Sequence, residues 1–205
     1  MIDAFASGLL LGLACGLAPG PLMALVLDHS LRHGAREGCK VALGPLFTDV
    51  PIIVLTLILA GKLAEIRPWL GGVSIAGGAF VLYLAWVSLR ARQPESQAPA
   101  ERAASWSKGI LTNLLSPHPW LFWLTVGAAT LARALAHSRL AAATFLGGFY
   151  LLLVGSKLLL ASLAARARRF LAGRAYRAVM RALAVLLGLF ALLLFREGWN
   201  LLLPK

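Results

Sequence analysis

The chain has 205 residues, of which 60% are hydrophobic and 14% charged, and its mean hydropathy is +0.80. Soluble domains carry about 25% charged residues, so this composition excludes an ordinary soluble protein and indicates one that crosses a membrane several times. The net charge of +12 would suggest nucleic-acid binding in a soluble protein. Here the basic residues lie between apolar runs, where they set orientation and contact lipid headgroups, so we expect lipid and no nucleic acid as a partner.

Six apolar runs predict an all-α membrane protein with six transmembrane helices, because each run is long enough to cross a hydrocarbon core of roughly 30 Å. They cover residues 3–27, 41–61, 69–89, 109–132, 140–164 and 178–196. No basic segment precedes the first run, so we expect it to be a mature span and not a signal peptide. The polar, proline-containing stretch 93–108 is the predicted cytoplasmic linker between two three-helix halves, 1–92 and 109–205.

The first run contains Pro19-Gly20-Pro21 near its middle. Proline removes a backbone donor and clashes with the preceding turn, and glycine adds conformational freedom, so this sequence predicts a break in the helix. Inside a bilayer such a break is tolerated only where protein or a water-filled cavity satisfies the freed carbonyls. We therefore expect a broken helix that contributes to a substrate pathway.

Small residues recur every four positions along the same run, which lets another helix approach closely. They are Ala4, Gly8, Gly12, Gly16 and Gly20. The pattern is compatible with packing inside the chain and with the face of a homodimer.

A second proline break follows in the fourth run, where Asn113 and Ser116 precede Pro117, His118 and Pro119. Proline-interrupted segments in corresponding positions of two halves point to the binding site of a transporter. Because each half has an odd number of spans, the second half enters the membrane from the opposite side, which predicts inverted repeats with broken helices 1 and 4. The side chains of Asn113, Ser116 and His118 are expected to bond the freed backbone or to contact the substrate.

Two ionisable residues lie within predicted spans. Asp49 is about eight residues into the second span, hence roughly 12 Å deep, and Lys157 lies at a similar depth in the fifth. Such residues face the interior of the bundle and either pair or function. One interpretation is a structural Asp49–Lys157 ion pair between the second and fifth helices. The other makes Asp49 a proton acceptor or a ligand for a substrate ammonium, with Lys157 meeting a substrate carboxylate.

The basic residues gather in alternate connections, which fixes the expected orientation. The first, third and fifth connections are the basic ones, so by the positive-inside rule they are cytoplasmic and both termini are extracytoplasmic. Their basic residues are Arg32, Arg36, Lys40, Arg90, Arg92, Arg102, Lys108, Arg166, Arg168, Arg169, Arg174, Arg177 and Arg181.

No catalytic residue, metal site or cofactor is predicted from the spacing of reactive side chains. Asp28, His29 and His33 lack a recognised metal-ligand spacing, and Asp28 with Arg32 is interpreted as an i,i+4 pair. The spans show no nucleophile–base arrangement and no paired catalytic carboxylates, so an enzyme is not expected.

Several motifs resemble the LysE-type (lysine exporter, RhtB-like) family of amino-acid translocators. They are Gly16-Leu17-Ala18-Pro19-Gly20-Pro21, Gly34-Ala35-Arg36-Glu37-Gly38, Ala42-Leu43-Gly44 with the following Asp49, and Asn113-Leu114-Leu115-Ser116-Pro117 with Trp120-Leu121-Phe122. The resemblance implies a six-helix inner-membrane exporter that uses the proton gradient to move amino acids or related metabolites outward. It gives functional weight to Pro19, Gly20, Pro21, Asp49, Asn113 and Pro117.

The chain also departs from that family's pattern. The second-half signature usually reads Asn-Pro-Lys, whereas this chain has Ser116-Pro117-His118 followed by Pro119, and Pro45 follows Gly44. These departures leave the substrate open. Because the wider superfamily includes metal-ion exporters, divalent-metal efflux is the alternative function, with His118, Asp49 and Asn113 converging on one ion.

Overall fold

The computed structural model describes residues 2–58, 63–90, 104–167 and 173–203. These residues are almost entirely helical, which confirms the predicted all-α class. The elements in chain order are α1 (Ile2–Leu17), α2 (Pro21–His33), α3 (Ala35–Ala42), α4 (Gly44–Ile58), α5 (Leu63–Leu89), α6 (Ser105–Leu114), α7 (Pro117–Phe122), the π-helix η1 (Trp123–Gly127), α8 (Ala128–His137), α9 (Arg139–Ala167) and α10 (Gly173–Leu202).

Several helices have the length and apolar character of membrane spans. Among the described residues, Ala35–Thr56, Arg139–Ala167 and Arg174–Leu202 each qualify alone, and α1 with α2 qualifies as one bent span. Helix α5 contains a shorter apolar stretch, Gly71–Trp86. The structure therefore supports a protein with several membrane crossings. The crossings through α5 and through α6 to α8 stay predictions, and residues 59–61 of the second expected span lie outside the described residues.

The first predicted break is present, but the helices that follow it have other boundaries than the sequence predicts. Helix α1 ends at Leu17, and α2 begins at Pro21 with a bend of 65° between the two. Helix α2 continues past the predicted end at residue 27 to His33, and the connection expected at 28–40 contains α3. The two helices meet at Gly34, whose φ of 92° is a left-handed conformation that favours glycine. The polar residues around Gly34 resemble a loop in composition, which is why the sequence did not predict α3.

The predicted linker between the halves overlaps the start of α6. Residues 93–103 of the predicted linker 93–108 lie outside the described residues, and α6 already begins at Ser105.

The glycine stripe of α1 packs inside the chain. Gly8, Gly12 and Gly16 are buried against α9, and a Cβ atom on any of them would overlap atoms of that helix. At Gly8 and Gly12 the overlapped atoms are the backbone oxygens of Phe145 and Phe149. Gly20, the last residue of the stripe, has nothing within 4 Å of an added Cβ. Gly8, Gly12 and Gly16 therefore explain the close α1–α9 packing, and these three positions are not available as a dimer face.

Replacing Gly12 by alanine is expected to destabilise the protein by about 1–3 kcal/mol, because the backbone of α9 cannot move away as a flexible side chain would. The same substitution at Gly147 of α9 is the matched control, since an added Cβ meets nothing there. Gly147→Ala should be neutral or slightly stabilising. Thermal unfolding of the detergent-purified variants measures the difference, and equal midpoints for the two would contradict this account of the packing.

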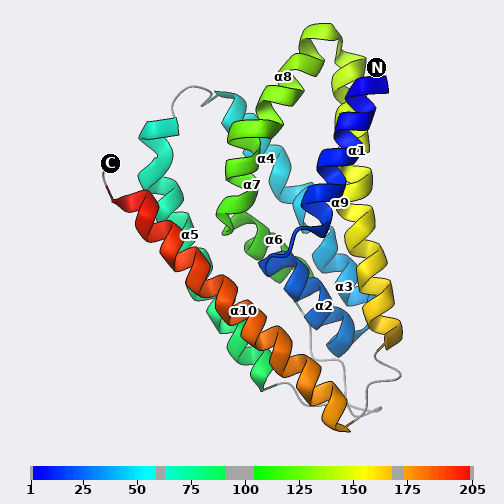
Figure 1. Cartoon of the computed structure of the whole chain (residues 1–205), viewed down its shortest axis with the longest axis vertical. Helices are drawn as coiled ribbons and strands as arrows, with labels where there is room; N and C mark the ends of the chain where they lie inside the picture. Colours follow the sequence, from blue (N-terminus) through cyan, green and yellow to red (C-terminus); the bar gives the residue numbers. More distant parts are fainter. Residues whose placement is uncertain (1, 59–62, 91–103, 168–172, 204–205) are drawn as a thin grey trace.

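Three helix pairings connect the two predicted halves of the chain. Helix α1 runs along α9, α3 and α4 contact α6, and α5 and α10 lie side by side as a long antiparallel pair (Figure 1). In the last pair Ser74 Oγ donates a hydrogen bond to the Leu194 carbonyl at 2.7 Å, and Gly71 lies close to the backbone of Gly198. Each pairing joins one predicted half of the chain to the other.

Candidate functional site: a cavity between two helix breaks

A cavity of about 340 Å³ lies where the two proline breaks meet. Every predicted site residue except Pro117 lines it. Pro117 is buried at the first position of α7. The lining residues from the sequence prediction are Pro19, Gly20, Pro21, Asp49, Asn113, Ser116, His118 and Lys157. Two segments far apart in the sequence thus contribute to one cavity.

Lys157 of α9 satisfies the backbone freed at the first break. Its Nζ donates hydrogen bonds to the carbonyl oxygens of Gly16, at 2.9 Å, and Cys15, at 3.2 Å. Both carbonyls belong to the last turn of α1, where a helix concentrates partial negative charge and a cation is favoured. The Lys157 side chain is only 4% exposed. An internal cation therefore holds the end of α1 in place.

The second break is stabilised differently. Helix α6 ends at Leu114, and α7 begins at Pro117 after the extended residue Ser116. Trp120 Nε1 donates to the freed Leu114 carbonyl at 2.9 Å. The Asn113 side chain, expected to bond the backbone or the substrate, instead donates from Nδ2 to Thr48 Oγ1 at 2.6 Å and to Asp49 Oδ1 at 3.0 Å. This break is therefore joined to α4 through side chains.

Asp49 is 3% exposed and bonded on both carboxylate oxygens. Asn113 donates to Oδ1, and Tyr150 Oη donates to Oδ2 at 3.3 Å. The Trp123 side chain lines the same cavity, but its buried Nε1 makes no hydrogen bond of standard geometry to the described residues. Two other elements, α6 and α9, thus fix the position of this one acid.

Asp49 and Lys157 share the cavity without forming a direct ion pair. Among the described residues, ion pairs with an N–O separation of 4.0 Å or less join Asp28 to His29 and Arg32, and Glu37 to Lys40. The structural Asp49–Lys157 pair, one of the two interpretations of the sequence, is therefore not formed in this conformation. Each buried charge is instead held by its own partners.

Aromatic side chains close the cavity on the side of η1 and α9. Phe122 stacks on Phe149 with ring centroids 5.3 Å apart, and the fully buried Trp123 meets Phe149 edge-on at the same separation. Trp123 begins the π-helix η1, a type of turn that is frequent at functional sites.

Sequence reasoning missed Tyr150, Trp123 and Phe149. Tyr150 precedes Lys157 by seven residues, two helical turns, and so lies on the same helix face. That spacing was an available signal. For Trp123 no such signal existed, because its inward orientation depends on a π-helical turn that the sequence pattern does not reveal.

The remaining candidate residues are either exposed or located outside the cavity. His118 lines the cavity but is exposed. Asp28 is buried at the far end of α2, where Ser88 Oγ donates to it at 2.8 Å and Arg32 lies at 3.5 Å, as the predicted i,i+4 pair. The described residues contain no group of three or more His, Cys, Asp or Glu side chains arranged to hold a metal ion.

Comparison with known proteins identifies the family of the chain. The family model described as LysE type translocator matches residues 13–198. The membrane protein YahN of Escherichia coli (strain K12), itself uncharacterized, is 28% identical over 194 residues, which cover 88% of this chain and 83% of YahN. No solved structure matches the chain significantly. The family match covers both breaks and nearly all of the helical core, and the chain therefore belongs to the LysE type translocator family.

Proposed function

We propose that this translocator exports amino acids or similar small zwitterions across the inner membrane, by alternating access and driven by protons. The observation that carries the proposal is the pair of buried opposite charges, Asp49 and Lys157, which face one cavity without touching each other. A zwitterion between them would present its ammonium to Asp49 and its carboxylate to Lys157.

Both residues keep hydrogen-bonding capacity for a substrate. An ammonium group has three donors, and the bonds found for Lys157 in the described structure use two of them. A carboxylate has about four acceptor positions, and Asn113 and Tyr150 occupy two on Asp49. Buried charges with unfilled hydrogen-bonding positions are costly, so a ligand that fills the remaining positions on both Asp49 and Lys157 would be favoured.

The pairing of helices supports inverted repeats. The broken α1–α2 segment packs on α9 of the second half, and the broken α6–α7 segment packs on α4 of the first half. If α1–α2 corresponds to α6–α7, α4 to α9 and α5 to α10, exchanging the two halves converts the first pairing into the second. The α5–α10 pair is then related to itself. A carrier with this symmetry can open to either side by moving one set of helices against the other.

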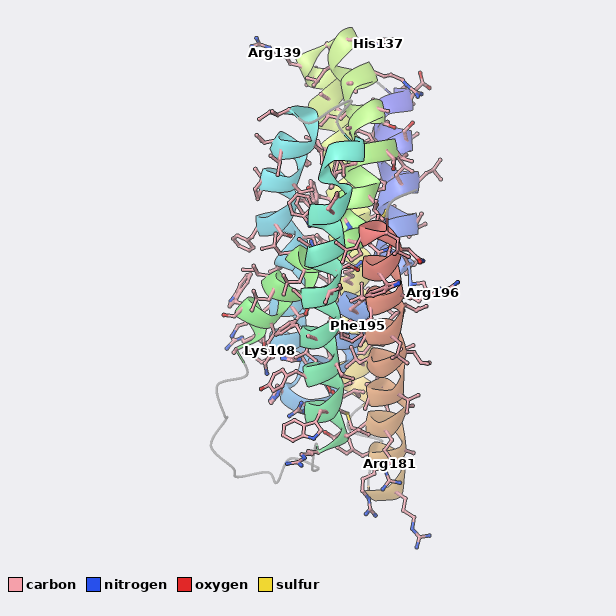
Figure 2. All side chains as sticks on the ribbon, turned by 90° about the vertical axis from the view of Figure 1, so that its left-hand side faces the viewer. Lys108, His137, Arg139, Arg181, Phe195 and Arg196 are labelled. Atoms are coloured by element: carbon pink, nitrogen blue, oxygen red, sulfur yellow. The ribbon has the colours of Figure 1, made fainter. Side chains whose placement is uncertain are left out.

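The distribution of basic residues supports the proposed orientation. In Figure 1 the basic ends of α2 and α9, the end of α5 before Arg90, and the start of α10 lie in the lower part of the molecule. The start of α1 and the end of α10 lie in the upper part. Figure 2 shows Arg181 at the end opposite Arg139. The lower end is therefore proposed to be cytoplasmic and the termini extracytoplasmic.

Proton coupling is assigned to Asp49, the acid that lines the cavity. If the Asp49 carboxylate binds a proton on one side of the membrane and a substrate ammonium on the other, it cannot hold both at once. Each outward movement of substrate is then coupled to the inward movement of a proton.

Counterflow into proteoliposomes tests this function. Vesicles containing the purified protein are loaded with a mixture of unlabelled amino acids, and entry of each labelled amino acid is measured against protein-free vesicles. Accumulation of at least one amino acid, increased by an imposed pH gradient, is the expected result. Absence of counterflow for every amino acid would refute the proposal.

A divalent metal ion is the second candidate substrate, because Asp49, Asn113 and His118 line the same cavity. If a metal is carried, Zn²⁺, Cd²⁺ or Mn²⁺ should raise the unfolding temperature of the purified protein, and His118→Ala should abolish that shift. We expect no such shift, because Asn113 is already committed to Thr48 and Asp49. A metal-dependent shift lost in the variant would favour metal efflux over amino-acid export. His137→Ala is the control, since His137 lies at the end of α8 and outside the cavity lining.

A further inference from the structure

We infer that the transported zwitterion carries an apolar side chain, which is received by a wall made of Phe122, Phe149 and Leu153. This inference rests on the proposed function and specifies its substrate class.

The charged lining residues lie next to the two helix breaks: Lys157 bonds the end of α1, and Asp49 is bonded by Asn113 at the second break. Besides Asn113, Ser116, His118, Cys15, the prolines and Gly20, the other lining residues are apolar, and the larger ones are Leu22, Met23, Phe122, Trp123, Phe149 and Leu153. A zwitterion that engages Asp49 and Lys157 would therefore project its side chain among hydrocarbon and aromatic groups. Burying an apolar side chain there is favourable, whereas a third charge would lose its hydration without gaining a partner.

The wall is aligned with Lys157. Phe149 and Leu153 precede Lys157 by eight and four residues on α9, so all three lie on one helix face. Phe122 stacks on Phe149 and extends the apolar surface toward the second break. A substrate carboxylate at Lys157 would thus place its side chain next to Leu153 and the Phe149–Phe122 stack.

Apart from Asp49 and Lys157, the described residues that line the cavity include no Asp, Glu, Lys or Arg residue that could pair with a charged side chain. Asn113 uses its amide donor on Thr48 and Asp49. Ser116 and His118 lie at the second break. The volume of about 340 Å³ is at the lower end of the range for ligand pockets, roughly 300–1,000 Å³, which suits one amino acid and not a peptide.

Counterflow in proteoliposomes separates the substrate classes. We expect leucine, methionine or phenylalanine to exceed lysine, glutamate and serine by about tenfold or more. Transport of lysine or glutamate at a level equal to or above that of leucine would overturn this inference and leave export itself standing. If no amino acid is transported, the proposed function fails, and this inference with it.

The wall itself is tested by Leu153→Ala, with Leu159→Ala as the matched control because Leu159 lies on the same helix with 61% exposure. The ratio of leucine to alanine counterflow should fall about tenfold in Leu153→Ala and stay unchanged in Leu159→Ala. A purely structural role would lower both substrates equally. An unchanged ratio in Leu153→Ala would show that the wall does not contact the side chain.

Discussion

Replacement of Asp49 by asparagine is expected to abolish gradient-driven transport while the protein stays folded. Asparagine has nearly the same shape: its Oδ1 can accept the hydrogen bond from Asn113, and its Nδ2 can donate to Tyr150 Oη, so the links between α4, α6 and α9 are largely kept. What is lost is the charge that binds a substrate ammonium or takes up a proton. A hydrogen bond to a charged group contributes about 1.5–3 kcal/mol, so binding should weaken roughly 10- to 100-fold.

Counterflow and accumulation driven by a pH gradient, measured separately in proteoliposomes, distinguish the two roles assigned to Asp49. If Asp49 only carries the proton, Asp49→Asn keeps counterflow and loses accumulation driven by a pH gradient. If it also binds the ammonium, both are lost. Asp28→Asn is the control, because it makes the same change at a buried acid outside the cavity lining. We expect Asp28→Asn to lower thermal stability and to leave coupling intact. Unchanged gradient-driven transport in Asp49→Asn would remove this residue from the mechanism.

The positions of both helix breaks could be predicted because proline acts locally. Pro21 and Pro117 each occupy the first position of a new helix, where a missing backbone donor has no cost. Burial of Asp49 and Lys157 was likewise predictable, since a charge inside an apolar run must face protein. These local rules were enough to select residues that the fold gathers around one cavity.

What could not be predicted depends on how distant segments meet. The stripe of Gly8, Gly12 and Gly16 predicts close packing, but the sequence does not state which helix approaches, and the structure supplies α9. Similarly, Asp49 and Lys157 are predicted at similar depths in the membrane. Depth alone does not fix the distance between them in the membrane plane, and that distance decides whether they form an ion pair. The partner that stabilises the first break, Lys157, also comes from tertiary placement, whereas Trp120 at the second break bonds the carbonyl of Leu114 within the same segment of the chain.

Lys157 combines a structural contact with a proposed substrate contact, and the two can be separated. Lys157→Met keeps the length and the apolar stem but leaves the carbonyls of Cys15 and Gly16 without this donor. An unsatisfied buried carbonyl costs about 1–3 kcal/mol, so the unfolding temperature should fall. Lys157→Arg keeps a charged donor and should recover much of that stability.

The substrate contact is tested by comparing the binding of two ligands, an amino acid and its carboxamide. In the wild-type protein the carboxylate should be preferred, because only it is charged toward Lys157. Lys157→Met should reduce that preference about tenfold or more, whereas a loss of stability alone would weaken both ligands equally. Ser156→Ala is the control, since Ser156 precedes Lys157 on α9 and its Oγ bonds the Leu153 carbonyl of its own helix. If Lys157→Met retains the wild-type preference, the lysine serves only to hold the end of α1. The zwitterion would then have to be anchored by Asp49 alone, and the break in α1 would be a fixed bend instead of part of the binding site.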